Sequence, residues 1–268
     1  MQEAYLRWHR TDQAAVRSPE AWLVTVVSRI AIDRLRRLNT ERAAYPGTWV
    51  PEPIATDTPI APSAPQAPDR GAELASDLSV ALLVLLERLA PEERAAFLLR
   101  EVFGADFAEI ARILDRRPDA VRQMVHRARV RVRSGRPRVP PPPAVHEDLL
   151  ERYLAALAAD DARALLALLA PDVVLASDGG GRVLAARNRI VGADRVARFL
   201  LGVQRKFGRE TIHQLAQLNG QPALLTVKCG KVISAIAFDI DGSHIRAVYS
   251  VRNPEKLRRV LEGVGAIS

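Results

Sequence analysis

The chain has 268 residues, of which 48% are hydrophobic and 26% charged, so a wholly disordered or collagen-like protein is excluded. Its length allows roughly one to three domains. No apolar run approaches the ~18 residues of a membrane span, and the polar N-terminus is not typical of a secretory signal. The single cysteine, Cys229, excludes an internal disulfide framework; its apolar flanks predict a buried, inert thiol. We expect a cytoplasmic protein with no membrane partner, metal or cofactor.

The net charge of +8, from 39 basic and 31 acidic residues, favours an acidic partner such as nucleic acid. The average hides the distribution, because residues 1–138 and 139–268 each carry a net charge of +4. Residues 119–138, by contrast, hold seven arginines against the single acid Asp119. This stretch is the one concentrated basic feature of the chain.

Two proline-rich stretches divide the chain. Residues 51–68 contain six prolines and no helical or strand period, and residues 137–143 form a second, stiffer spacer. The predicted organisation is a helical region at 1–48, a linker at 49–73, a second helical module at 74–136, a short linker at 137–144 and a C-terminal domain at 145–268.

The first region contains an amphipathic helix that begins at Pro19, after Ser18 as N-cap. Leu23, Val26 and Ile30 follow its apolar stripe. Its opposite face carries Arg29, Asp33, Arg34, Arg36 and Arg37. A domain of about 50 residues with only two helices would be marginal, so this region reads as incomplete.

The second module is predicted to contain four short helices, and the last two have helix-turn-helix proportions. Ile110, Ala111 and Leu114 would pack against Val121, Val125 and Ala128. Arginine suits guanine, glutamine suits adenine and trailing arginines suit phosphates; a merely solvated basic face is the alternative. The predicted DNA-facing residues are Ala120, Arg122, Gln123, His126, Arg127 and Arg129.

The C-terminal region changes character. Helices are predicted at 146–157, 162–169 and 193–207, and a first strand at 173–177. Segments with a period of two or an apolar run predict further strands at 210–218, 222–229, 231–240 and 244–252. Helices followed by an antiparallel meander indicate a compact α+β domain.

These segments resemble a known family. QEAYLRW, AWLVTVVSRIAIDRLR and LAPEERAAFLLREVFGADFAEIARILDRRPDAVRQMVHRAR resemble regions 2 and 4 of bacterial extracytoplasmic-function sigma factors. The C-terminal domain resembles a SnoaL-like, NTF2-type domain, which implies a curved antiparallel sheet around a pocket. WVPEP (49–53), DGGGR (178–182) and NPEKL (253–257) are similar to signatures of the sigma-factor group with this extension, WVPEP and NPEKL each with one conservative difference.

The resemblance implies a sigma factor that directs core RNA polymerase to promoters. Region 4 would read the −35 element and contact the flap, and region 2 would read the −10 element and contact the clamp. It places Gln2, Glu3, Leu6 and Trp8 on the polymerase and Arg29, Asp33, Arg34, Arg36 and Arg37 on the −10 helix. The extension would regulate activity in cis through Trp49, Pro51, Glu52, Pro53, Asp178, Gly179, Gly180, Gly181, Arg182, Asn253, Pro254, Glu255, Lys256 and Leu257, and we expect it to contact Trp49–Pro53 or the first region.

Alternatives remain at several of these positions. The glycines also suit a plain tight turn, Asn253 with Pro254 also suits a helix start, and Trp22 suits a core. The chain begins inside the region 2 pattern, which is explained either by a start assigned to an internal GTG codon or by a defective sigma factor.

Catalysis is the least supported reading. The polar candidates of the extension have no catalytic spacing, so we expect no enzyme and no catalytic residue. A small molecule in the SnoaL-like pocket is a further candidate partner. The alternative function is a ligand-sensing or enzymatic SnoaL-like domain on a DNA-binding adaptor that acts without core polymerase. The polar candidates are Asp178, His213, Lys228, Asp239 and His244.

Overall fold

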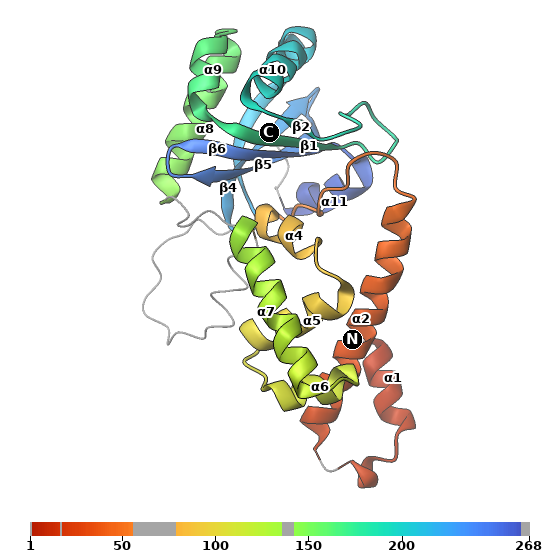
Figure 1. The fold of residues 1–268 in the computed structure, drawn as a ribbon. Helices are drawn as coiled ribbons and strands as arrows, with labels where there is room; N and C mark the ends of the chain where they lie inside the picture. Colours follow the sequence, from red (N-terminus) through yellow and green to blue (C-terminus); the bar gives the residue numbers. More distant parts are fainter. Residues whose placement is uncertain (1, 17, 56–78, 136–141, 264–268) are drawn as a thin grey trace. The chain divides into compact units, whose positions relative to one another are not determined.

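The computed structural model describes residues 2–16, 18–55, 79–135 and 142–263 (Figure 1). It contains two compact units, a helical unit of residues 1–44 with 85–135 and a sheet unit of residues 45–84 with 136–268. Most of the two predicted linkers, 56–73 and 137–141, lies outside the described residues. Within the described part of the chain, no helix combines the length and apolarity needed to cross a membrane.

The described residues of the helical unit are mostly helical, as predicted for both regions. The helices are α1 (Gln2–Arg10), η1 (Gln13–Ala15), α2 (Pro19–Ala43), α5 (Pro91–Glu101), α6 (Phe107–Leu114) and α7 (Pro118–Gly135). The division between the units falls inside α4 (Val80–Leu86).

The start of α2 follows the predicted signal. The Ser18 hydroxyl accepts a hydrogen bond from the Ala21 amide at 3.3 Å, and Pro19 occupies the first helical position. Both features satisfy or remove amides that a helix start leaves unpaired. The predicted N-cap is therefore confirmed.

Helices α6 and α7 pack as the helix-turn-helix pattern predicts. Ile110 and Val121 are fully buried and Val125 nearly so. The Asp106 carboxylate caps α6 by accepting from the Glu109 amide at 2.6 Å, and Asp115 ends it in the left-handed conformation at φ 54°. Ile32 of α2 belongs to the same core. One face of α7 is thereby buried and the other is left outward.

The sheet unit begins with two helices and continues with six strands. Its elements are α8 (Pro143–Ala158), α9 (Ala162–Leu168), β1 (Leu169–Asp178), β2 (Ile190–Val191), α10 (Ala193–Phe207), η2 (Gly208–Glu210), β3 (Ile212–Leu218), β4 (Gln221–Lys228), β5 (Lys231–Asp241), β6 (His244–Val251) and α11 (Pro254–Gly263). The strand order is β2-β1-β6-β5-β4-β3. Strands β3 to β6 form the predicted antiparallel meander, whereas β1 runs parallel to β6, so the sheet is mixed.

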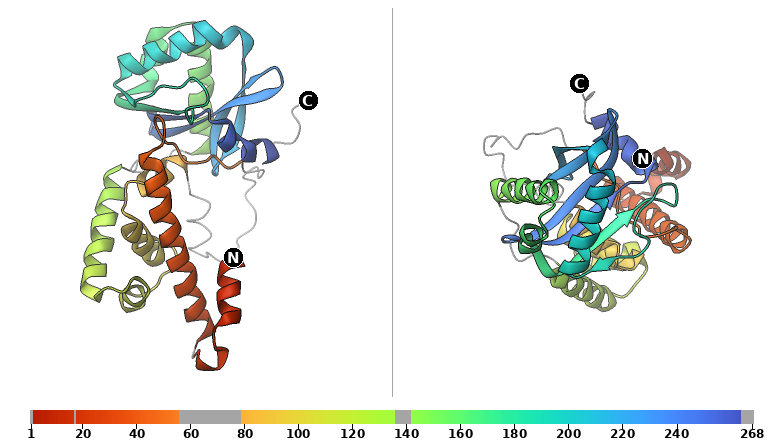
Figure 2. Two further views of the ribbon diagram at one scale, coloured as in Figure 1. Left: turned by 90° about the vertical axis from the view of Figure 1, so that its right-hand side faces the viewer. Right: turned by 90° about the horizontal axis from the view of Figure 1, so that it is seen from above.

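The sheet has a core on each face. Helices α8, α9 and α10 cover one face, where Tyr153 and Phe238 meet edge to face (Figures 1 and 2). Helix α11 lies on the other face, where Val50, Tyr249 and Val260 are buried. Successive residues of a strand point to opposite faces, so β1, β4, β5 and β6 contribute side chains to both cores. Register shifts within β4 and β5 are bulges, which bend strands.

The prediction that Cys229 is buried was wrong. Cys229 and Gly230 form the two-residue turn between β4 and β5, with φ of 49° and 70°. Two positive φ values define a turn type that suits a tight hairpin. The turn carries the thiol out to solvent.

Candidate functional site

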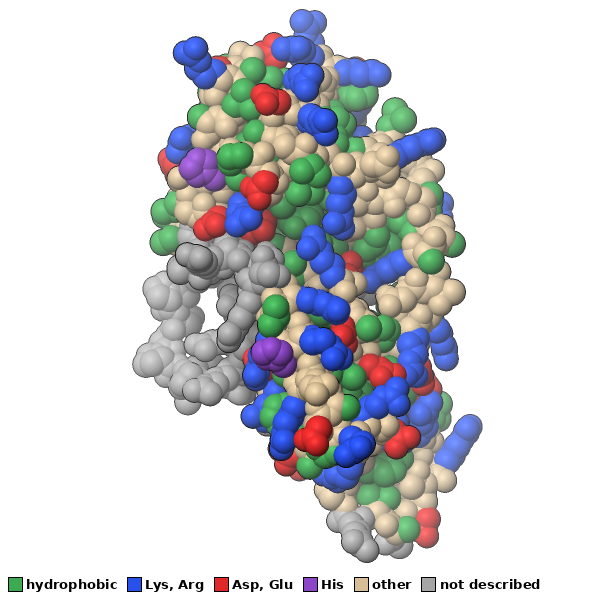
Figure 3. Space-filling model, in the orientation of Figure 1, with side chains coloured by type: hydrophobic (Ala, Val, Ile, Leu, Met, Phe, Trp, Pro, Cys, Tyr) green, Lys and Arg blue, Asp and Glu red, His purple; other side chains and the backbone are tan. Residues whose placement is uncertain are grey.

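The outward face of α7 is exposed and basic. Arg122, Gln123, His126 and Arg127 line an open groove of about 370 Å³, and Ala120 before them is also exposed. Figure 3 shows lysine and arginine side chains in blue on the face of the molecule that includes α7. The guanidinium of Arg122 lies 3.2 Å from Asp119 and stacks over the Phe107 ring. The arrangement presents hydrogen-bond donors along an otherwise well-packed helix.

Arginines near the end of α7 also have partners inside the helical unit. Arg129 donates from both Nε and Nη2 to Glu101 of α5 at 2.9 and 2.6 Å. Arg131 donates to Glu93 at 2.6 Å, and Arg127 lies 3.7 Å from the same carboxylate. The guanidinium of Arg129, predicted to contact DNA, therefore braces α7 against α5 in this structure.

The predicted −10 face of α2 is partly occupied within the helical unit. Arg29 donates to the carbonyl oxygens of Ile113 and Arg112 at 3.1 and 3.4 Å, at the end of α6 where carbonyls lack helical partners. Arg36 donates to Glu92 of α5 at 2.7 Å and to Asp33 at 3.0 Å. The predicted residues Arg34 and Arg37 are exposed.

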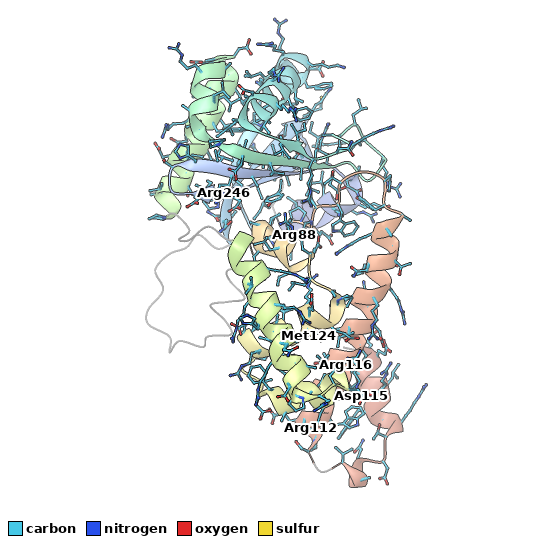
Figure 4. The ribbon with its side chains drawn as sticks, viewed as in Figure 1. Arg88, Arg112, Asp115, Arg116, Met124 and Arg246 are labelled. Atoms are coloured by element: carbon cyan, nitrogen blue, oxygen red, sulfur yellow. The ribbon has the colours of Figure 1, made fainter. Side chains whose placement is uncertain are left out.

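Glu92 also pairs with an arginine in the turn between α6 and α7. Arg116 lies 3.1 Å from its carboxylate, and Figure 4 shows Arg112, Asp115 and Arg116 at the turn between α6 and α7. Burial raises the pKa of Glu92, but the hydrogen bonds from Arg36 and Arg116 outweigh it and lower the pKa overall. The carboxylate thus joins α2, α5 and the turn after α6.

The residues predicted to contact polymerase lie on α1. Gln2, Glu3 and Leu6 are exposed, with Leu6 at 53%, and Trp8 packs edge to face on Trp22 at 5.1 Å between ring centroids. Trp22, predicted as core, is half-buried in this pair. Exposed apolar surface of this kind marks interaction sites, and it continues through Tyr5, Leu23, Val24 and Val27.

Asp178 of β1 organises the second candidate site, inside the sheet unit. Its side chain is fully buried and accepts four hydrogen bonds. The donors are the Tyr45 hydroxyl at 2.5 Å, the amides of Val50 and Gly180 at 3.0 Å each and the Lys256 ammonium at 2.7 Å. Residues 45–55, which we call the strap, are therefore fixed to the extension.

Lys256 binds the strap in two further ways. Its ammonium donates to the Val50 carbonyl at 2.6 Å and lies 3.2 Å from the centre of the Trp49 ring, a cation–π contact. Lys256 is only 8% exposed, so its charge relies on these partners. Burial, reinforced by the hydrogen bond to Asp178, raises the pKa of the Tyr45 hydroxyl.

Asn253 of the NPEKL signature bonds to both the strap and the DGGGR signature. Its side-chain oxygen accepts from the Glu255 amide at 3.0 Å, which caps α11, and its amide nitrogen donates to the Tyr45 hydroxyl at 2.9 Å. The main-chain amides of Arg252 and Asn253 donate to the Asp178 carbonyl at 2.7 and 2.9 Å. The helix-start interpretation of Asn253 and its contact with the strap are thus both correct.

The glycines of the DGGGR signature allow this close approach. Gly180 has φ of 61°, and a Cβ there would lie 2.4 Å from the Asn253 side chain. Gly181 has φ of 69°, and a Cβ there would lie 2.6 Å from Pro46 of the strap. A Cβ on Gly179 would meet the Val183 carbonyl at 2.4 Å. Arg182 closes the turn through an ion pair with Glu255 at 2.6 Å.

The far end of the strap pairs with the end of β3. The Ile54 amide donates to the Asn219 side chain at 3.1 Å, and the Asn219 amide donates to the Ile54 carbonyl at 2.8 Å. Pro51 and Pro53 are buried, and the expected contact between the extension and Trp49–Pro53 is confirmed. Sequence reasoning missed Tyr45 and Asn219; only the position of Tyr45, just before the WVPEP signature, could have suggested it.

A cavity of about 480 Å³ lies in the sheet unit, on the face covered by α8 and α10. Of the predicted polar candidates, His213 and Lys228 line it, whereas Asp178, Asp239 and His244 do not. The His213 ring lies 3.2 Å from the Thr226 hydroxyl, and burial lowers its pKa. Lys228 pairs with Glu210. Across the described residues, no group of three His, Cys, Asp or Glu side chains is placed to hold a metal.

Comparisons with known proteins identify relatives over nearly the whole chain. The family described as Sigma-70, region 4 matches residues 79–132. The ECF RNA polymerase sigma factor SigJ of Mycobacterium tuberculosis is 36% identical, over 96% of this chain and 83% of SigJ. The probable ECF sigma factor SigI of that organism is 30% identical, over 96% and 84%. The crystal structure of SigJ matches 99% of this chain and 89% of its own, with 33% identity and a TM-score of 0.71.

Proposed function

Because the chain belongs to the extracytoplasmic-function RNA polymerase sigma factors, we propose that it directs core RNA polymerase to specific promoters and that its SnoaL-like extension regulates this activity in cis. Its relatives over this length are transcription initiation factors rather than enzymes. The partners in this proposal are the clamp and flap of core polymerase and promoter DNA.

The observation that supports promoter recognition most strongly is the outward face of α7. Arg122 and Gln123 are exposed next to each other, while Val121 and Val125 hold the opposite face in the core. An arginine reads guanine and a glutamine reads adenine through paired hydrogen bonds in the major groove. We assign the −35 element to this face, with His126 and Arg127 contacting its edges and backbone.

Recognition of the −10 element requires a change inside the helical unit. Arg29 and Arg36 face α6 and α5 and must leave those partners before they can contact DNA. The exposed apolar residues of α1 and α2 give polymerase a surface whose burial offsets the loss of these contacts. We propose that docking of Leu6 and Trp8 on the clamp opens the unit and frees the α2 face.

The extension acts through the strap in this proposal. In the sequence the strap follows α2 almost directly. Asp178, Asn253 and Lys256 of the extension bind it. While it is held, the segment between regions 2 and 4 is shorter, which restrains the separation of the two regions that promoter binding needs. Release of the strap therefore raises activity.

Run-off transcription with the cognate core polymerase on fragmented genomic DNA tests the assignment. The chain should direct initiation at a small set of 5′ ends, and Arg122→Ala should weaken selection of the −35 sequence by about 1–3 kcal/mol, the value of one base-specific pair. Arg163→Ala, an exposed arginine of α9, is the matched control and should leave the start sites unchanged.

Two results would contradict the proposal. If no genomic site shows initiation that depends on this protein, promoter direction is excluded. Specific DNA binding that is equally tight with and without core polymerase would instead favour a DNA-binding adaptor that works alone. Binding through α7 should also weaken steeply with salt, because phosphate contacts release counterions.

A further inference from the structure

A row of polar side chains crosses the face of the sheet that lines the cavity. It contains Ser177 of β1, Ser250 of β6, Ser234 of β5, Thr226 of β4 and His213 of β3, and we call these five residues the polar row. Strand register pairs Ser177 with Ser250, Ser234 with Thr226 and Thr226 with His213. The Ser234 and Ser250 hydroxyls lie 3.0 Å apart, which joins the two halves. The row therefore runs without interruption over five neighbouring strands.

Burying the polar row costs free energy unless its polar groups find hydrogen-bond partners. Ser177, Ser234 and Thr226 are between 4% and 8% exposed, so their hydroxyls have little access to water. At one end of the row, Nε2 of His213 is buried and has no hydrogen-bond partner among the described residues. The combination is typical of a ligand site, which pairs apolar walls with a few convergent polar groups.

The charge of the lining indicates the class of ligand. None of the described residues that line the cavity is an aspartate or glutamate, whereas Arg252 and Lys228 both line it. Lys228 already pairs with Glu210. Arg252 is half-buried and donates to the Leu184 carbonyl, and burial lowers its pKa, so its charge is poorly compensated. Arginine matches the geometry of a carboxylate, and Phe199, Leu200 and Phe207 supply apolar walls.

Neighbouring residues of the same segments line the cavity and bind the strap. Ser177 lines the cavity while its neighbour Asp178 points to the opposite face and holds the strap. The same alternation places Arg252 on the cavity and Asn253 on the strap, and in α11 Leu257 lines the cavity beside Lys256. The Arg252 main chain is also bonded directly to the Asp178 carbonyl. A ligand that fixes Arg252 therefore acts on the residues that fix the strap.

We propose that the cavity binds an amphiphilic carboxylic acid, with its carboxylate on Arg252 and its apolar body along the polar row, and that the bound acid strengthens docking of the strap. This inference rests on the regulatory role proposed above for the strap. A ligand that binds the docked form more tightly than the undocked form shifts the equilibrium towards the docked form, by at most the difference between its two binding free energies. The bound acid is then a signal that keeps the strap docked on the extension.

Displacement of 1-anilinonaphthalene-8-sulfonate from the full chain measures the ligand class. Dodecanoate should displace the dye at a concentration about tenfold or more below that of dodecanol, because only the carboxylate forms an ion pair with the guanidinium. Arg252→Met should remove this difference and Arg252→Lys should keep part of it. Arg246→Met, in the strand β6 that Arg252 directly follows, removes an arginine that does not line the cavity (labelled in Figure 4) and should retain it in full. Val203→Trp, at a cavity position that is 38% exposed, should block displacement by filling the space.

Hydrogen exchange of the strap measures the coupling. Dodecanoate should slow exchange of the Val50 amide, and Arg252→Met should abolish the slowing. Equal displacement by acid and alcohol, unchanged discrimination in Arg252→Met, or exchange at Val50 that ignores dodecanoate would each overturn the proposal. These assays contain neither polymerase nor promoter, so a failure of promoter-directed transcription would leave their outcome unaffected, and the reverse also holds.

Discussion

Asp178 shows how one buried charge is tolerated because every acceptor position is used. It accepts from a hydroxyl, two amides and an ammonium, and is fully buried. A buried ion pair is weak evidence for stability by itself, because desolvation offsets the attraction. Its value lies in specificity: the strap cannot shift without breaking the bonds of Tyr45 and Val50 to Asp178 and that of Lys256 to the Val50 carbonyl. The pair defines one docked position.

Asp239 is a half-buried acid with the opposite character. Burial raises its pKa to about 6, and Arg246 opposes the shift only partly. The folded state therefore binds a proton more tightly than the unfolded chain does, and stability falls as pH rises through the window from about 4 to 6. Asp239→Asn should remove this loss and stabilise the protein at pH 7.5 by about 2 kcal/mol, with little gain near pH 3.5.

Urea unfolding at the two pH values checks the prediction. Asp148→Asn is the control, because that side chain lies on α8 and is 66% exposed. An Asp239→Asn gain that is equal at both pH values would mean that ionisation of Asp239 is not its source.

At the scale of elements, the glycine turn after β1 packs closely against the residues of the strap site. The φ values of Gly180 and Gly181 are both positive, and side chains from two other segments occupy the space next to them. Gly180→Ala should cost about 2 kcal/mol of stability, because alanine strains this backbone and meets Asn253. Gly202→Ala in α10 has open space and should stabilise slightly.

The two variants separate backbone strain from strap docking when hydrogen exchange accompanies urea unfolding. Gly180→Ala should speed exchange of the Val50 amide, and Gly202→Ala should not. Normal strap protection in a folded Gly180→Ala protein would mean that the turn serves only the hairpin.

Helix α2 illustrates a second element whose surface has two uses. Glu92 holds Arg36 and Arg116 in the free protein. Glu92→Gln should weaken the contact of α2 with α5 and, if polymerase binds the opened form, raise the affinity for core polymerase about fivefold, a gain near 1 kcal/mol. Fluorescence anisotropy with labelled protein measures this affinity. Glu147→Gln on the exposed side of α8 is the control, and equal affinity in the two variants would exclude Glu92 as a restraint.

At the scale of the whole molecule, the strap controls the length of chain between the two sigma regions. Residues 44–79 join α2 to α4, and docking fixes residues 45–55 of them on the extension. Each released residue adds at most about 3.5 Å of reach. In the proposed function, the extension would thus act on the connection between the two regions.

Lys256→Met tests this control of activity. Loss of the ammonium leaves Asp178 buried without its cation and removes the contacts to Val50 and Trp49, so the strap should undock. Run-off transcription should then increase about threefold to tenfold, a change of roughly 1 kcal/mol. Lys206→Met, at an exposed lysine of α10, should match the unaltered protein. Reduced transcription from a folded Lys256→Met protein would show that the docked strap promotes activity.

The sequence by itself determined the local elements and the family, because these depend on periodicity, caps and short signatures that are contiguous. Ser18 with Pro19, the alternation in β3 to β6 and the packing of Ile110 on Val121 are all readable from spacing. The sequence also named WVPEP, DGGGR and NPEKL, but no spacing showed that three segments so far apart share one carboxylate.

Only the tertiary structure decided how those residues are used. Parallel pairing of β1 with β6 brings Asp178 beside Asn253, and a one-residue alternation sends Ser177 to the cavity and Asp178 to the strap. Likewise, α2 turns Arg29 and Arg36 toward α6 and α5, although the same residues read in sequence as a free basic face. The reason is physical: periodicity fixes which side chains share a face, but the partner that covers the face depends on long-range packing.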